Sequence, residues 1–225
     1  MLTSSQMRDL EARAIASGEV SGAELMERAG AGVVAAMLDR WPGWDGVSKA
    51  PWAGQLVAVL AGPGNNGGDG YVITRLLAEA GAEPRVFAMG EADRLPPDAA
   101  RARNLWSGPV VAFEDAEVKA LADEVADRGQ GCLVVVDALF GIGQRAPLDE
   151  VTGRVWRLFD RLAGLNVRLW VVAVDLPTGY DADSGEALAA RPLPADLTVT
   201  FHQPKPIHGM PQFLDRELVV HDIGI

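Results

Sequence analysis

Apolar residues occur along this chain in short continuous runs, and the stretches between the runs have helical spacing. Four runs predict buried strands, at residues 56–61, 85–89, 133–137 and 169–174. Shorter runs predict two later strands, at residues 197–201 and 217–220. Because apolar residues fill these runs without strict alternation, both faces of each strand are expected to be covered. The pattern predicts an α/β fold with a mostly parallel central sheet.

Helical periodicity predicts helices before and between the strands. Thr3, Ser4 or Ser5 suits the N-cap of a first helix, and a second helix is expected from about residue 22 to residue 38. Further helices are predicted at 97–106, 116–127 and 151–162, whereas Pro, Gly and Trp predict a loop at 42–52. The sequence has no internal repeat, low-complexity tract or linker. We therefore expect one domain over residues 1–225, with a helical N-terminal segment (1–40) packed on the sheet.

The charge of the chain limits the partners that it can bind. The formal net charge is −11 and the pI is near 4.7, which argues against a nucleic-acid partner because such proteins carry a basic face. No apolar signal core is evident, and no apolar run approaches the roughly 20 residues of a membrane span. We expect no membrane partner and a cytoplasmic location. The single cysteine, Cys132, lies in an apolar run and is expected to be a buried hydrophobic residue rather than a nucleophile.

A glycine-rich segment, GPGNNGGDG at 62–70, joins the first predicted strand to a helical pattern. In a parallel sheet such a turn lies at the carboxyl end of a strand, where ligands bind. Glycine lets a ligand approach the backbone closely, and the N-terminus of the following helix suits phosphate. Asn65, Asn66 and Asp69 are not needed for turning, so we interpret them as side chains aimed at a ligand. The alternative is that they cap the helix and satisfy turn amides.

Polar residues also follow two later strands. Asp137 ends the strand at 133–137, and Asp175 and Thr178 follow the strand at 169–174. In a doubly wound sheet these strand ends lie on one edge, so these side chains are expected to converge with Asn66. Amide, carboxylate and hydroxyl oxygens suit a hard cation, and the Asn and Thr among them favour a monovalent ion such as potassium. As alternatives, the aspartates cap the following loops and Thr178 is a turn hydroxyl.

Lys205 stands between two prolines after the predicted strand at 197–201. It either reaches a ligand pocket or is a solvated loop residue. Asp181 and Asp183 are interpreted as turn formers, because the glycine and terminal glutamate of an EF-hand loop are absent. The histidines lack the spacing of metal ligands and are interpreted as surface or packing residues: His202, His208 and His221.

Four segments in their order and spacing resemble the NAD(P)H-hydrate epimerase family, also called the YjeF-type N-terminal domain. They are GPGNNGGDG at 62–70, VDALFGIG at 136–143, VDLPTGYDADSG at 174–185, and TVTF with PKP within 198–206. The resemblance covers nearly the whole chain. It implies a Rossmann-like three-layer α/β/α sandwich that interconverts the R and S epimers of NADHX and NADPHX. These hydrated forms of NADH and NADPH carry a hydroxyl group at C6 of the nicotinamide ring.

The resemblance also implies roles for individual residues. Substrate phosphates are expected over two segments, which comprise Asn65, Asn66, Gly67, Gly68 and Asp69, and Gly141, Ile142, Gly143, Gln144, Arg145, Ala146 and Pro147. One potassium ion per subunit is expected at Asn66, Asp137 and Thr178. Asp175 is the expected acid/base in contact with the reacting part of the substrate, and Lys205 is the second catalytic candidate. Ile142 replaces the threonine usual in the family, which leaves its backbone N–H as the donor to phosphate.

Family members are often joined to a C-terminal dehydratase that repairs the S epimer. The expected partners are therefore that enzyme, separate or fused, and a second copy of the chain in a homodimer. An oxidoreductase that uses NAD as a hydride carrier is disfavoured, because the loop is not Gly-x-Gly-x-x-Gly and residues 85–90 include no acid. A non-catalytic nucleotide-binding or protein-interaction module is disfavoured by the intact Asn66, Asp137 and Asp175.

Overall fold

A seven-stranded sheet, in which every strand is parallel to its neighbours, forms the centre of the molecule. The computed structural model describes all residues except 42–51, 130, 146, 166 and 215, so the loop predicted at 42–52 lies almost wholly outside the described residues. The strand order is β3-β2-β1-β4-β5-β6-β7. The bounds are β1 (Leu56–Ala61), β2 (Glu83–Ala88), β3 (Val110–Ala112), β4 (Cys132–Ala138), β5 (Arg168–Val174), β6 (Leu197–Phe201) and β7 (Glu217–His221). The predicted parallel sheet is confirmed.

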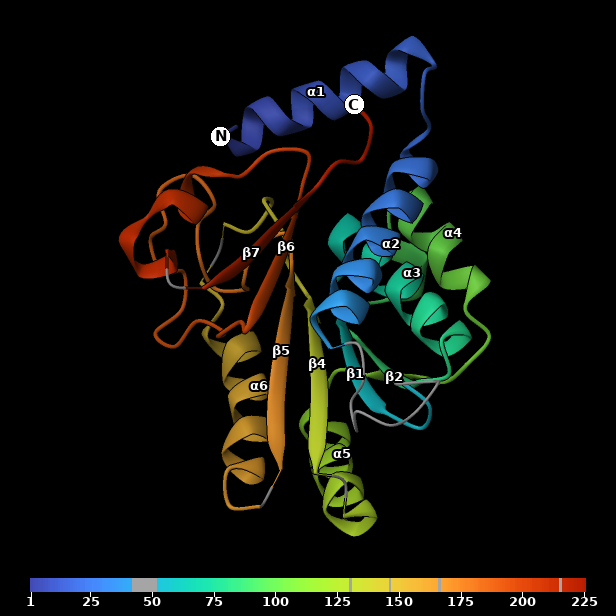
Figure 1. Ribbon diagram of the computed structural model, residues 1–225, viewed down its shortest axis with the longest axis vertical. Helices are drawn as coiled ribbons and strands as arrows, with labels where there is room; N and C mark the ends of the chain where they lie inside the picture. Colours follow the sequence, from blue (N-terminus) through green and yellow to red (C-terminus); the bar gives the residue numbers. More distant parts are fainter. Residues whose placement is uncertain (42–51, 130, 146, 166, 215) are drawn as a thin grey trace.

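Helices cover both faces of this sheet (Figure 1). They are α1 (Ser4–Ser17), α2 (Gly22–Arg40), α3 (Asn65–Glu79), α4 (Pro97–Leu105), α5 (Asp115–Arg128) and α6 (Asp149–Leu162), with short 3₁₀ helices η1 (Ala92–Arg94), η2 (Pro206–Gly209) and η3 (Pro211–Phe213). The core under α2 and α3 lies on one face, and the core under α5 and α6 lies on the other. The predicted three-layer sandwich is therefore confirmed. In the described part of the chain, no helix is both long enough and apolar enough to cross a membrane.

Side chains of the central strands point alternately into two cores. Val134 of β4 packs in one core with Ile73 of α3, whereas its neighbour Leu133 packs in the other core with Leu158 of α6. All four side chains are buried. Both faces of the strand need apolar residues, which is why the apolar runs show no alternation. Cys132 at the start of β4 is also buried, and burial raises the pKa of its thiol to about 12, as expected of a packing residue.

The sequence analysis did not predict β3. This strand has three residues and lies at the edge of the sheet, paired only with β2. A run so short has no periodicity that distinguishes it from a loop. In the sheet, β2 and β3 lie on one side of β1, and β4 to β7 lie on the other side. The crevice between the carboxyl ends of β1 and β4 is therefore the topological switch point, where open α/β sheets bind ligands.

Helix α1 crosses the molecule at this carboxyl edge (Figure 1). Of the three candidate caps, Thr3 is the N-cap, and its hydroxyl accepts a hydrogen bond from the Gln6 N–H. The backbone N–H and the hydroxyl of Ser4 both donate to Asp183 Oδ1, at 2.7 and 3.0 Å. Asp181 Oδ1 in turn accepts from the backbone N–H of Asp183, so its role as a turn former is confirmed. These contacts fix the start of α1 on the loop that follows β5.

Candidate active site

A cavity of about 390 Å³ lies at the carboxyl ends of β1, β4 and β5 and is bounded by α1. Its volume is within the usual range of small-molecule sites. The cavity is lined by Met7, Arg8, Glu11, Pro63, Gly64, Asn65, Asn66, Asp69, Leu139, Phe140, Gly141, Ile142, Gly143, Gln144, Asp175, Phe201 and Lys205. Residues from distant parts of the chain meet here because their strands end at one edge of the sheet.

The glycine-rich turn brings the N-terminus of α3 to this cavity. A Cβ atom at Gly62 would overlap the carbonyl oxygen of Leu139, and one at Gly67 would overlap the carbonyl oxygen of Gly62. Glycine is therefore required where the turn packs on itself and on the segment after β4. Helix α3 has no side-chain cap, so the Asn and Asp residues do not satisfy its first N–H groups. An uncapped helix N-terminus that faces a cavity suits a phosphate group.

A buried ion pair lies at another wall of the cavity. Lys205 Nζ is 2.5 Å from Asp175 Oδ1, and the Thr200 hydroxyl donates to the same carboxylate oxygen at 2.8 Å. Lys205 is 1% exposed, so the alternative of a solvated loop residue is wrong. Burial alone would raise the pKa of Asp175, but the Lys205 ammonium and the Lys205 and Thr200 hydrogen bonds hold it below its ordinary value. Asp175 is therefore ionised at neutral pH.

The backbone keeps this pair in place. Asp175 has φ near +70°, a left-handed conformation that Asp adopts more readily than most residues. The side chain of His208, which the sequence analysis assigned only to the surface or to packing, is buried behind Lys205. Its Nδ1 accepts a hydrogen bond from the Lys205 backbone N–H at 3.0 Å. Burial lowers the pKa of His208 to about 4, so the imidazole is neutral at pH 7 and supports the loop without adding charge.

Asp137, at the end of β4, is fully buried but has a different set of partners. Its Oδ1 accepts from the Thr178 hydroxyl at 2.7 Å, and its Oδ2 accepts from the Thr178 N–H at 2.8 Å. Within the described residues, no basic side chain forms an ion pair with Asp137. Burial raises the pKa of Asp137 to about 6 in spite of the Thr178 hydrogen bonds. When Asp137 is ionised, no positively charged side chain among the described residues neutralises it.

Asn66 supplies another oxygen donor at the same edge. A Cβ atom at Gly141 would be 3.0 Å from Asn66 Oδ1 and 3.1 Å from Asp175 Oδ2, so the missing side chain leaves both oxygens accessible. Asn66 Nδ2 is buried and has no hydrogen-bond partner within the described residues. The described residues also hold no cluster of three or more His, Cys, Asp or Glu side chains suited to a metal ion. Amide, hydroxyl and carboxylate oxygens beside an uncompensated charge fit a monovalent hard cation such as potassium.

Two carboxyl groups besides Asp175 line the cavity, and the sequence analysis missed one of them. Burial, the charge of Asp175 and the charge of Glu11 raise the pKa of Asp69 well above its ordinary value. Burial and the charge of Asp175 raise the pKa of Glu11 on α1, against the opposing effects of Lys205 and Arg8. The first helix carries charged residues like those of any solvated helix face, so its pattern gave no sign that Arg8 and Glu11 enter a site.

The remaining predicted binding residues differ in their position relative to the cavity. Gly67 and Gly68 are buried inside the first turns of α3 and do not line it. Arg145 and Pro147 are exposed and lie outside the lining, and Arg145 Nη1 is 4.0 Å from Asp181 Oδ2. Ala146 lies outside the described residues. The structure therefore brings together Asn65, Asn66 and Asp69 with the segment 141–144, Asp175 and Lys205.

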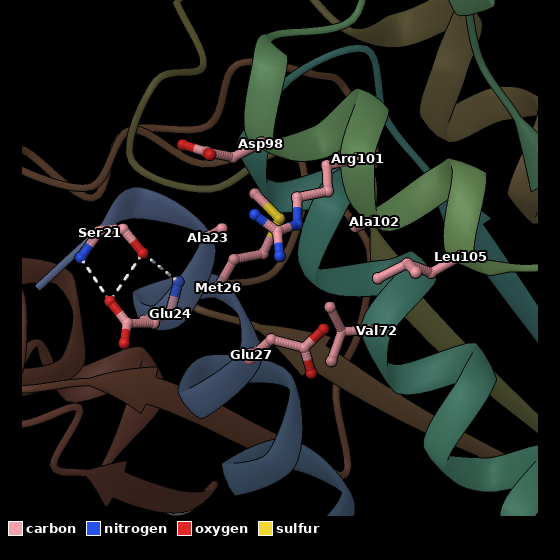
Figure 2. Close-up of a pocket in the computed structure, with 10 residues that line it drawn as sticks. All are labelled: Ser21, Ala23, Glu24, Met26, Glu27, Val72, Asp98, Arg101, Ala102 and Leu105. Carbon is pink, nitrogen blue, oxygen red and sulfur yellow. Dashed lines mark hydrogen bonds between the residues drawn. The ribbon is translucent and has the colours of Figure 1, made fainter.

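Two other cavities lack this combination of groups. A groove of about 390 Å³ lies between α2, α3 and α4, and Figure 2 shows the residues that line it. Two of its polar residues, Ser21 and Glu24, form the capping box of α2. A third cavity of about 420 Å³ lies at the ends of β1, β2 and β3 and includes Glu91, Arg103 and Arg154. Neither cavity contains a buried carboxylate paired with a buried lysine.

Comparison with known proteins places the chain in a family. A family model described as "YjeF-related protein N-terminus" matches residues 22–207. The NAD(P)H-hydrate epimerase of Rhodobacter capsulatus is 42% identical over 228 residues, which cover 100% of this chain and 99% of the relative. The bifunctional NAD(P)H-hydrate repair enzyme Nnr of Coxiella burnetii is 36% identical over 205 residues, which cover 89% of this chain and 36% of the relative.

A solved structure extends the likeness to the fold. The crystal structure of the yeast protein ynu0 superposes with a TM-score of 0.69 and 26% sequence identity, over 92% of this chain and 82% of that chain. The residues matched by the family model include the turn before α3, the ends of β4 and β5, and Lys205. They exclude α1, although α1 lines the cavity. By its sequence, its fold and the arrangement of this site, the chain belongs to the family of YjeF-related proteins.

Proposed function

We propose that this protein is an NAD(P)H-hydrate epimerase, an isomerase that interconverts the R and S epimers of NADHX and NADPHX. Relatives similar over the full chain bear this name. The observation that carries the proposal is the cavity that joins the uncapped N-terminus of α3 to the buried pair of Asp175 and Lys205. A hydrated nicotinamide dinucleotide has the matching parts, which are a pyrophosphate and a ring whose C6 hydroxyl group needs proton transfer in order to leave and return.

Substrate phosphates are proposed to bind between the first turn of α3 and the segment after β4. Asn65 and Asn66 line one side of this region, and Gly141, Ile142 and Gly143 line the other. Backbone N–H groups provide the contacts, which suits a protein whose net charge is −11. Ile142 contributes through its backbone and not through a hydroxyl.

The chemistry requires C6 of the ring to lose and regain a hydroxyl group. The ring nitrogen can expel this group by forming a double bond to C6, if an acid protonates the leaving oxygen. Asp175 is ionised and is proposed to stabilise the cationic ring and to accept a proton from the incoming water. Lys205 keeps Asp175 charged and oriented. Opening and reclosure of the ring is a second route, which uses the same carboxylate.

We propose one potassium ion per subunit, held by Asn66, Asp137 and Thr178. When bound, the ion supplies positive charge that favours the anionic substrate. The support is the buried Asp137, whose pKa is raised to about 6 and which has no basic partner within the described residues. Asp137 and Thr178 do not line the cavity, so they are proposed to act through the ion and not by contact with the substrate.

The test is direct conversion of a single epimer. Purified R and S forms of NADHX are incubated separately with the protein, and the mixture is followed by chromatography against a control without protein. Accelerated interconversion from both sides supports the proposal. A rate equal to that of the control, with the ligand bound, would favour the non-catalytic nucleotide-binding module.

The proposed functional partner is a dehydratase that consumes the S epimer, either as a separate protein or as a fused domain. The bifunctional repair enzyme of Coxiella burnetii, of which this chain matches 36%, supports this proposal. An epimerase alone leaves an equilibrium mixture of the two epimers. An enzyme that consumes one epimer is therefore needed to remove both. The homodimer stays a prediction, which the mass of the protein in solution tests.

A further inference from the structure

Helix α1 brings a carboxyl group into the cavity from the side away from the strand ends. Glu11 lines the cavity together with Arg8 and Met7 of the same helix, whereas Asp175 and Lys205 enter from the loops that follow β5 and β6. The contacts of Leu2 with Pro204 (2.9 Å) and of Ser4 with Asp183 hold the start of α1 across this edge. Glu11 therefore has a fixed helical backbone and lines the same cavity as Asp175 and Lys205, close enough for their charges to act on it.

The side chain of Glu11 serves no structural contact within the described residues. It is half-buried, yet its oxygens form no hydrogen bond or ion pair with any residue that the structure describes. By contrast, Glu24 at the start of α2 closes a capping box with Ser21. A half-buried carboxyl group that is not used to hold the fold is available to a ligand in the cavity.

The charges around Glu11 favour different protonation states for the two carboxyl groups. Asp175 is held ionised by Lys205, as described above. Burial and the Asp175 charge raise the pKa of Glu11, while Lys205 from the loop after β6 and Arg8 from α1 oppose this shift. Asp69 of α3 faces both groups and also has a raised pKa. Two carboxyl groups whose environments separate their pKa values are suited to opposite roles as acid and base.

Epimerisation at C6 by loss and return of a hydroxyl group requires a proton carrier on each face of the ring. Loss of the group from one face leaves a planar ring cation, which then takes water on the other face. A single carboxyl group that is fixed by a lysine and a threonine reaches only one face. The structure holds one carboxyl group on the strand side and another on the α1 side.

We propose that Glu11 is a second catalytic residue of this reaction, which acts as the general acid from the face opposite Asp175. The inference rests on the proposed epimerase function. In one direction the Glu11 carboxyl gives its proton to the C6 hydroxyl, the C–O bond breaks, water leaves, and the nitrogen lone pair forms the bond to C6. Water then adds to C6 from the other face, returns the electron pair to nitrogen, and gives its proton to Asp175. In the reverse direction the roles exchange, and solvent restores the starting protonation states.

The experiment compares Glu11→Gln, Glu11→Asp and Asp9→Asn with the wild type, using the separated epimers of NADHX over a range of pH. Asp9→Asn is the matched control, because Asp9 is an exposed carboxyl group on the same helix and does not line the cavity. Glu11→Gln should lower kcat by ~100-fold or more and should change KM little, since the amide keeps the size but cannot donate the acid proton. In the wild type the rate should fall at high pH, where the general acid loses its proton. This fall should be absent in Glu11→Gln and present in Glu11→Asp.

Several outcomes would overturn the proposal. A Glu11→Gln rate within twofold of the wild type would do so, as would equal losses in Glu11→Gln and Asp9→Asn. The assignment also fails if Asp69→Asn, and not Glu11→Gln, removes the fall in rate at high pH. If the wild type itself does not accelerate interconversion, the proposed function fails. If the wild type is active and Glu11→Gln is unaffected, only this inference fails. Thermal melting of each variant separates loss of chemistry from loss of fold.

Discussion

Two buried aspartates at the carboxyl edge of the sheet have pKa values that are shifted in opposite directions. Asp175 after β5 has Lys205 at 2.5 Å, and its pKa is lowered. Among the described residues, Asp137 at the end of β4 has only hydrogen bonds from Thr178 and Leu139, and its pKa is raised to about 6. Burial acts on both in the same direction, so the difference comes from the presence or absence of a cation.

This difference separates two tasks within one site. The ammonium group of Lys205 is part of the chain, so Asp175 is ionised at neutral pH without an ion from solution. Asp137 has no such partner within the described residues, and our proposal is that a cation from solution supplies the missing charge. We therefore propose proton chemistry for Asp175 and ion binding for Asp137, and the following experiments test that division.

The largest effect is expected from Asp175→Asn. The amide keeps the shape but cannot accept a proton, so kcat should fall by ~100- to 10,000-fold. The rate is measured with the separated epimers, and circular dichroism checks the fold. Asp160→Asn is the control, because Asp160 is an exposed carboxylate that pairs with Arg191 and does not line the cavity. An unchanged rate in Asp175→Asn would remove its catalytic role.

Lys205→Met should turn the surroundings of Asp175 into an environment like that of Asp137. Loss of one partner of a buried ion pair lowers the free energy of unfolding by about 3–5 kcal/mol, which urea denaturation measures. The pKa of Asp175 is lower in the folded wild type than its ordinary value of 3.8, so the ionised carboxylate stabilises the fold at pH values above 3.8. This contribution is lost as the pH falls. The variant should therefore lose less stability than the wild type on acidification. Equal acid sensitivity of the two proteins would contradict the account of the pair.

Potassium should stabilise the protein at pH 8 more than at pH 5. The pKa of Asp137 is raised from 3.8 to about 6 in the folded protein, so the protonated carboxyl group contributes fully to stability below pH 3.8. This contribution is lost as the pH rises through about 6. A bound cation offsets this loss, and an excess of 10- to 100-fold over Kd stabilises by about 1.4–2.7 kcal/mol. Thermal melting in potassium chloride is compared with melting in choline chloride at equal ionic strength. Asp137→Asn should abolish the difference, and a difference that persists would place the ion elsewhere.

The smallest effects are expected from the two supporting hydroxyl groups. Thr200→Val removes one hydrogen bond to Asp175 but leaves Lys205, so the free energy of unfolding should fall by about 1 kcal/mol without a change in the potassium effect. Thr178→Val should cost a similar amount and should also weaken the response to potassium. Both are read from urea denaturation with and without the salt. A potassium response lost in Thr200→Val and kept in Thr178→Val would reverse the assignment of the two aspartates.

Local pattern was sufficient wherever neighbouring residues alone decide the structure. The continuous apolar runs predicted all the strands except β3, because a strand covered on both faces needs apolar residues at every position. The turn at 62–70 was identified because its glycines lie between an apolar run and a helical pattern, and the structure shows that Gly62 is required where the backbone approaches Leu139. Asp137 and Asp175 were identified because parallel strands end at one edge.

Only the tertiary structure decided what surrounds each of these groups. Lys205 was equally suited to solvent or to the pocket, and its place was settled by the loop that buries it against Asp175. Glu11 and Arg8 lie far from the glycine motifs in sequence, and only the anchoring of α1 on the loop after β5 brings them to the cavity. The sequence by itself determined the sheet and the types of donor at its edge, because hydrophobic periodicity and turn chemistry are local. The protonation states depend on distances between segments up to about 200 residues apart, so they are properties of the folded chain.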